Sequence, residues 1–111
     1  MGTAAKPLDL YNFRVHHALA IVYFSSERYG DALGAARSAV HANPRFSTAH
    51  AVLAAALWRA GHPMEAKNAA RNVLRHEPAF SIQGVQRVSG ELEPTVFKRF
   101  SDAWHEIGLP N

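Results

Sequence analysis

The chain contains no cysteine, which excludes disulfide bonds, thiol nucleophiles and cysteine-based zinc sites together. It also has no apolar run that approaches the roughly 18 to 20 residues needed for a membrane-spanning helix. The first ten residues carry no long apolar stretch that could serve as a signal peptide. We therefore expect a soluble, cytoplasmic protein without redox chemistry or membrane contact.

A concentrated basic surface is also missing, although the net charge is +3. The charge comes mainly from nine arginines spread over the whole chain, and acidic residues such as Glu65, Glu77 and Glu106 interrupt them. Surfaces that bind nucleic acid instead gather basic residues on one face, with aromatic residues between them. We expect no nucleic-acid partner.

Signatures of catalysis and of cofactor binding are lacking too. No Ser, His and Asp residues stand in a recognisable catalytic motif, and no glycine-rich loop resembles a phosphate-binding loop. Seven histidines are present, but none forms the i, i+4 pair that places two imidazoles on one helical face. The sequence predicts neither an enzyme nor a cofactor or metal site.

Alanine dominates the apolar residues that the chain does contain, and strand signals are nearly absent. Because alanine is the best helix former and the smallest packing residue, closely packed helices are favoured over a sheet. A chain of 111 residues is long enough for one domain with a modest core. The predicted fold class is all-α.

Two segments of the chain, residues 13–46 and 47–80, align without a gap at a period of 34 residues. Nine positions are identical, where composition alone would give about two or three, so duplication of one unit is the simplest explanation. The identical pairs are His16 and His50, Leu19 and Leu53, Ala20 and Ala54, Ala32 and Ala66, Ala35 and Ala69, Ala36 and Ala70, Arg37 and Arg71, Pro44 and Pro78, and Phe46 and Phe80.

The sequence of each unit predicts two helices joined by a short turn. We expect helices over about residues 9–25, 29–42, 49–58 and 63–76. Asn43 and Pro44 end the second helix, and Ser47 is a good N-cap for the third. Gly61 breaks the third helix, and Pro63 stands in a first turn, where proline is tolerated.

The order of small and large residues in both units resembles the tetratricopeptide repeat family. The family's positions are met by Leu19, Ala20, Tyr23, Ala32, Ala39 and Pro44, and then by Leu53, Ala54, Leu57, Ala66 and Pro78. Histidine replaces the usual tryptophan near the start of each unit, and Glu27 stands where the family's turn glycine falls, whereas Gly61 keeps it. The resemblance implies two helix hairpins of a right-handed α-solenoid.

The residues after the repeats divide into a connector and one more helix. Residues 81–93 contain two glycines and scattered polar residues, so we expect a connector or a short irregular helix there. Over 94–107 an apolar stripe returns at helical spacing, formed by Val96, Phe97, Phe100, Ala103, Trp104 and Ile107. A stripe with this many aromatic residues must be buried. We therefore expect the helix to cap the open end of the second repeat.

The same tail resembles the C-terminal end of bacterial proteins that join a nucleotide cyclase domain, or a winged-helix regulator domain, to a tetratricopeptide array. The resemblance is carried by Phe80, Ser81, Ile82, Arg99, Phe100, Gly108, Leu109 and Pro110. It implies that the chain is the regulatory C-terminal part of a larger signalling protein. Residues 1–12 are then a lead-in, either an artificial start or the end of a preceding repeat.

Tetratricopeptide arrays bind partners in a groove lined by the first helix of each pair. The resemblance places Arg14, His17, Ile21, Phe24, Thr48, Ala51, Ala55, Trp58 and Arg59 in that groove. His17 and Ile21 occupy two places of the lysine and asparagine pattern that grips a peptide's terminal carboxylate in chaperone-binding members. An equally strong interpretation is that Phe24 and Trp58 only contact neighbouring helices or the cap, since aromatic stripes are usually core.

Two hypotheses for function follow. The first is a non-catalytic protein-interaction module that holds a peptide or helix in this apolar groove. The alternative is a self-assembly element, because two repeats are fewer than such arrays usually need. In that case we expect a homodimer through the N-terminal helix, with Tyr11 and Ile21 as contact residues.

Overall fold

The computed structural model describes residues 5–88 and 92–111, with side chains from 12 to 87 and from 92 to 111. Its secondary structure within those residues is entirely helical, which confirms the predicted all-α class. The helices are α1 (Ala5–Ser25), α2 (Tyr29–Ala42), α3 (Ser47–Arg59), α4 (Pro63–His76), α5 (Ile82–Val88) and α6 (Pro94–Ile107). None of the described helices is long and apolar enough to span a membrane.

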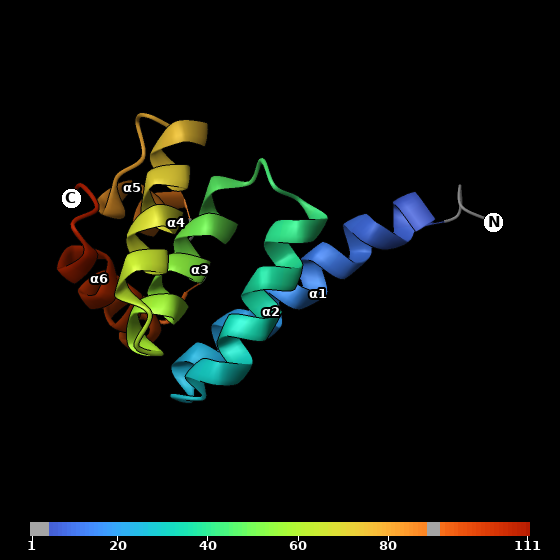
Figure 1. Cartoon of the computed structure of the whole chain (residues 1–111), viewed down its shortest axis with the longest axis horizontal. Helices are drawn as coiled ribbons and strands as arrows, with labels where there is room; N and C mark the ends of the chain where they lie inside the picture. The colour runs from blue at the N-terminus through green and yellow to red at the C-terminus, as the bar shows by residue number, and fades with distance from the viewer. Residues whose placement is uncertain (1–4, 89–91) are drawn as a thin grey trace.

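The helices form two neighbouring hairpins (Figure 1), in which α1 packs on α2 and α3 packs on α4. Contacts between α2 and α3 join the hairpins. The start of α1 lies at one end of the 44 Å long molecule, and the end of the chain lies at the other. Because α1 is seven residues longer than α2, its N-terminal part extends past the hairpin.

Helix boundaries follow the predicted ones closely. The second and last helices begin and end as expected, and the fourth runs from Pro63 to His76. The first helix begins at Ala5 rather than near Asp9, and α5 occupies part of the expected connector. The predicted N-cap of α3 is wrong: Ser47 is the first helical residue, Phe46 precedes it as the N-cap, and the Ser47 hydroxyl donates a hydrogen bond to Glu77 instead. The difference in α1 is consistent with sequence chemistry, because Pro7 then falls in the first turn, where its missing N–H has no intrahelical partner to lose.

The alanines predicted to allow close helix approach are buried. Ala32 and Ala66, which are equivalent in the two units, are both fully inaccessible to solvent. Further buried alanines lie in the shared core at positions 20, 36, 51, 54, 55, 56, 69 and 70. Small side chains at these sites leave room for neighbouring backbones, and larger residues fill the space between them.

Helix α6 has defined caps at both ends. The side chain of Glu93 accepts a hydrogen bond of 2.6 Å from the Thr95 N–H before the first turn. Gly108, with φ of 109°, ends the helix in a left-handed cap, the conformation that glycine adopts without steric cost. These caps fix where the aromatic stripe of α6 starts and stops.

The position of α6 differs from a cap confined to the end of the second repeat. The helix packs against α3 and makes further contacts with α4 and α5, and its Phe100 reaches Phe24 in α1. Beyond α6 the chain turns back, and the Ile82 N–H donates a hydrogen bond of 2.9 Å to the Pro110 carbonyl. The aromatic stripe is thereby buried: Phe100, Ala103 and Trp104 are each no more than 1% exposed.

Candidate functional site

The surface formed by Phe24 of α1 and by Ala51, Ala55, Trp58 and Arg59 of α3 is called the groove below. All five residues were predicted to line a binding surface. Ala51, Ala55 and Arg59 recur at a spacing of four, so they lie along one side of α3, with Trp58 beside them. Contacts of Phe24, Ala51, Trp58 and Arg59 with α6 show that this helix lies along the groove.

Aromatic contacts fill the centre of the groove. The ring of Phe24 is buried against that of Phe100, with 4.1 Å between the ring centroids. Phe100 in turn stacks on Trp104 at 5.5 Å, and Phe80 meets Trp104 edge-on at 6.2 Å. Such arrangements add to the stabilisation that comes from burying these large apolar surfaces.

Trp104 also makes a directional contact with the groove floor. Its side chain is only 1% exposed, and its Nε1–H donates a hydrogen bond of 2.7 Å to the carbonyl oxygen of Ala51. A helical carbonyl retains a second lone pair, so it can accept this bond in addition to its intrahelical one. The hydrogen bond satisfies the buried indole and fixes the register of α6 on α3.

One end of the groove binds a carboxylate of α6 with three hydrogen bonds. Glu106 accepts bonds of 2.8 and 3.2 Å from the two terminal nitrogens of Arg59, and one of 2.8 Å from Trp58 Nε1. The Arg59 guanidinium, and secondarily the Trp58 indole, hold the pKa of the Glu106 carboxyl below its ordinary value. The reciprocal hydrogen bond from Arg59 to Glu106 raises the pKa of Arg59.

A second ion pair joins α6 to the turn after α1, and here α6 supplies the basic residue rather than the acidic one. Arg99 Nη1 lies 2.9 Å from the Glu27 carboxylate, and both side chains are partly exposed. The hydrogen bond to Glu27 raises the pKa of Arg99. The two ends of α6 therefore meet charges of opposite sign on the hairpins.

Sequence reasoning gave Glu27, Arg99 and Glu106 no place in the binding surface. On the same helix, Lys98 pairs with Asp102 one turn away on the exposed surface. A usable signal was present: residues 99 and 106 are seven apart and therefore share a face of the helix.

The other residues predicted for the groove lie elsewhere. Arg14 is exposed, and Ile21 is half-buried with its side chain packed against the core. Thr48 lies beside a pocket of about 350 Å³ that Phe80 and Val85 also line. The residues predicted for the groove therefore do not all line one surface.

His17 belongs to a separate aromatic cluster. Its ring stacks on Phe13 at 5.6 Å and meets Phe46 edge-on at 5.5 Å. Nδ1 of His17 is buried without a hydrogen-bond partner, and burial lowers the pKa of the imidazole because the charged ring would lose its hydration. His17 is a packing residue in this arrangement.

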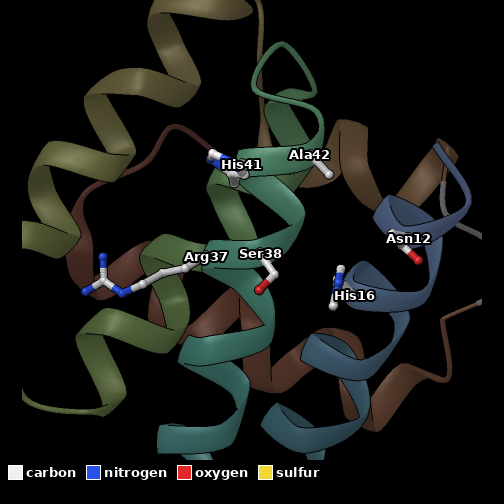
Figure 2. Close-up of a pocket in the computed structure, with 6 residues that line it drawn as sticks. All are labelled: Asn12, His16, Arg37, Ser38, His41 and Ala42. Atoms are coloured by element: carbon white, nitrogen blue, oxygen red, sulfur yellow. The ribbon is translucent and has the colours of Figure 1, made fainter. Parts of the chain in front are cut away.

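A polar pocket of about 560 Å³ lies between α1 and α2 (Figure 2). Asn12, His16, Ser38 and Arg37 are among its lining residues. In the close-up, His16 and Ser38 lie near each other, whereas the Arg37 side chain extends away from them. The Arg37 guanidinium instead lies 3.6 Å from the Glu65 carboxylate, so the polar groups of this pocket do not converge on one point.

The residues that the structure describes include no candidate metal site. No cluster of three or more histidine, aspartate or glutamate side chains there is arranged to hold an ion. His50 is buried, and its Nε2 donates a hydrogen bond of 2.7 Å to the Pro44 carbonyl, while its ring stacks on His76. This repeat-equivalent histidine thus contributes to packing where the two units join.

Comparisons with protein-family models, curated proteins and solved structures gave no match. The resemblance to tetratricopeptide repeats and to the tails of bacterial signalling proteins therefore stays a prediction from the sequence.

Proposed function

We propose that the chain is a non-catalytic protein-interaction module whose groove binds an amphipathic helix. The observation that carries this proposal is the presence of such a helix in the groove, namely α6. The contacts of α6 combine a buried aromatic anchor, a hydrogen bond from Trp104 and a carboxylate held by Trp58 and Arg59. An apolar helix face laid into an apolar groove is a common mode of peptide recognition.

The position of α6 gives the module a regulatory character. A partner helix can enter the groove only in molecules whose α6 has left it, so the apparent affinity is the intrinsic affinity reduced by that open fraction. Together with the tail resemblance, this supports a role as the regulatory C-terminal part of a larger bacterial signalling protein, such as a nucleotide cyclase. The groove is then a cytoplasmic binding site for another protein or another segment of the parent.

A peptide with the sequence of residues 94–111 tests the proposal. Labelled with a fluorophore and titrated with the full chain, it should bind saturably, and binding should tighten when Phe100→Ala weakens the chain's own α6. The control is the same peptide with both Phe100→Ala and Trp104→Ala, which removes the two anchors. Absence of binding to the wild-type chain and to the Phe100→Ala chain would rule the proposal out.

Self-assembly is the second candidate, and an exposed apolar stripe on α1 favours it. Val15, Leu19 and Val22 are 38%, 38% and 56% exposed and share one face of the helix. Their counterparts in the second unit, Ala49, Leu53 and Ala56, are buried or half-buried, in a helix that packs against α2. A second copy of the chain that meets the stripe across a two-fold axis would cover it.

A further inference from the structure

A row of cations runs along the exposed side of α4. Lys67, Arg71 and Arg75 follow one another at a spacing of four residues, and all three side chains are exposed. Residues four apart lie on the same face of a helix, about 6 Å from one to the next along its axis. The row therefore presents three positive charges over about 12 Å of the surface.

These cations differ from most others on the described surface, because no described carboxylate pairs with them. The cations that do lie in ion pairs are Arg28, Arg37, Arg59, Lys98 and Arg99. The remaining described cations, Arg14, Arg45 and Arg87, are exposed but lie on separate segments, namely α1, the turn before α3, and α5. Within the described part of the chain, cations without an ion pair form a row only on α4.

The helix dipole accounts for only part of this row. Cations are stabilising near the C-terminus of a helix, and the effect is confined to about the last turn. Arg75 stands in the last turn of α4. Lys67 and Arg71 lie further towards the N-terminus, so the dipole gives no reason for their charge.

An apolar hollow of about 230 Å³ borders the row where α4 lies beside α6 (Figure 1). Lys67 and Arg71 line this hollow together with Ala70 and Leu74 of α4 and with residues 107–109 at the end of α6. Ala70 belongs to the hydrophobic core, and Leu74 packs against it. The hollow is therefore a fixed feature of helix packing, with an apolar lining and two positive charges beside it.

Met64 extends the same side of α4 towards its N-terminus. It stands three residues before Lys67 and seven before Arg71, so the three side chains share a face of the helix. Met64 is 84% exposed, the highest value among the exposed large hydrophobic side chains of the described residues. Methionine is flexible and polarizable, and both methionine and arginine are enriched in protein interfaces.

We propose that this surface, called the basic face below, binds an acidic segment of another protein, which places an apolar side chain in the hollow. The basic face consists of Met64, Lys67, Arg71 and Arg75 together with the lining of the hollow. Charge complementarity specifies the partner: carboxylates four residues apart on a helix have the same spacing of about 6 Å as the cations. The basic face is accessible with α6 in place, so the proposal goes beyond the proposed function of the groove.

The hollow favours an acidic protein over a nucleic acid. A phosphate backbone has no apolar group to place in it, and the residues that line it include no aromatic ring on which a base could stack. An acidic helix can satisfy both parts of the surface, because its carboxylates pair with the row while one apolar side chain is buried beside Leu74.

A labelled acidic peptide tests the proposal on the full chain. The probe is four repeats of Glu-Glu-Leu-Ala, in which glutamate and leucine each recur every four residues. Fluorescence anisotropy should show saturable binding at low salt that weakens as salt is added, because exposed charges are then screened. A peptide with glutamine in place of glutamate, and one with serine in place of leucine, should each bind about tenfold more weakly or worse.

A pair of host variants locates the binding site. Lys67→Gln, Arg71→Gln and Arg75→Gln together should weaken binding of the probe about tenfold, because three exposed ion pairs are lost. The matched control carries Gln in place of Arg14, Arg45 and Arg87, which removes the same charge from scattered exposed sites, and it should bind like the wild type. Circular dichroism verifies that both hosts fold; if the α4 variant does not, Arg71→Gln alone replaces it and should still weaken binding.

Three outcomes would overturn the proposal. The first is no binding of the probe to the wild-type chain, and the second is an equal loss in both host variants, which would reflect net charge alone. The third comes from a single-stranded thymidine oligonucleotide as a second probe: if it binds more tightly than the peptide and loses affinity in the α4 variant, the partner is a nucleic acid. The proposed function of the groove stands or falls separately, because its test uses the peptide of residues 94–111.

Discussion

Glu27 and Gly61 take the same left-handed conformation at equivalent positions of the two units, with φ of 62° and 90°. Each follows the first helix of its hairpin. The next residue donates its N–H back across the turn in both cases, from Arg28 to the Tyr23 carbonyl and from His62 to the Leu57 carbonyl, each at 2.9 Å. The turn is thus retained in the first unit although the glycine expected from the family resemblance is not.

Replacing glycine by alanine should change the stability of the fold in opposite directions at Gly61 and Gly34. Gly61→Ala should destabilise the fold by about 1 to 2 kcal/mol, because a side chain disfavours the left-handed conformation. Gly34→Ala should stabilise it by roughly 0.5 to 1 kcal/mol, since Gly34 lies inside α2 and an added Cβ would meet no atom within 4 Å. Urea unfolding monitored by circular dichroism measures both, and effects of the same sign would contradict the assigned turn.

Overpacking the second hairpin should be costly. Ala66 is fully buried, so Ala66→Leu should lower the free energy of unfolding by about 1 to 3 kcal/mol as neighbouring side chains are displaced. The exposed Asn68 two residues later is the control, and Asn68→Leu should change stability by less than about 0.5 kcal/mol. An unchanged melting temperature in the Ala66 variant would show that the hairpin is built differently.

Deleting residues 94–111 should leave the groove uncovered. Phe24 and Ala51, which contact Phe100 and Trp104 of α6, would then be exposed to water. We expect the shortened chain to aggregate or to lose cooperative unfolding, because an apolar patch of this kind is poorly tolerated on a monomer. Light scattering and thermal unfolding give the readout, and a soluble, equally stable truncated monomer would show that α6 is an independent appendage.

Stability should fall as the pH is lowered through the range in which His17 titrates. Burial lowers the pKa of folded His17, so the unfolded chain binds more protons in this range. The stabilisation that the neutral, buried His17 contributes is complete when the pH is above the pKa of His17 in the unfolded chain, about 6.5. It is lost as the pH falls towards the lower pKa of His17 in the folded chain. His17→Phe should flatten the dependence of the unfolding free energy on pH between about 7.5 and 5.5, as measured by urea unfolding at each pH.

Self-association through α1 should depend on its exposed stripe. Leu19→Glu or Val22→Glu should abolish a dimer without unfolding the chain, because both side chains face solvent. The side chain of Tyr11 lies outside the described residues, and Ile21 packs against the core, so Ile21→Glu would test stability rather than contact. Sedimentation over a wide concentration range decides the matter: a strict monomer at high concentration excludes this assembly.

The sequence alone determined the elements and their local chemistry. The 34-residue period located both hairpins, and the spacing of Phe100, Trp104 and Ile107 located α6 and its apolar face. Positions such as Ala32 and Ala66 were recognisably buried because the two units repeat them. These features depend on residues close in the chain, where helical geometry fixes which side chains share a face.

The tertiary structure decided where α6 lies and what it contacts. A stripe of aromatic residues shows that a helix must be covered, yet burial is not directional, so the stripe cannot specify which of several apolar faces covers it. The choice rests on contacts between residues far apart in the chain, Phe24 with Phe100 and Trp58 with Glu106. Such contacts leave no periodicity in the sequence, because only the packed hairpins bring the groups that form them within reach of one another.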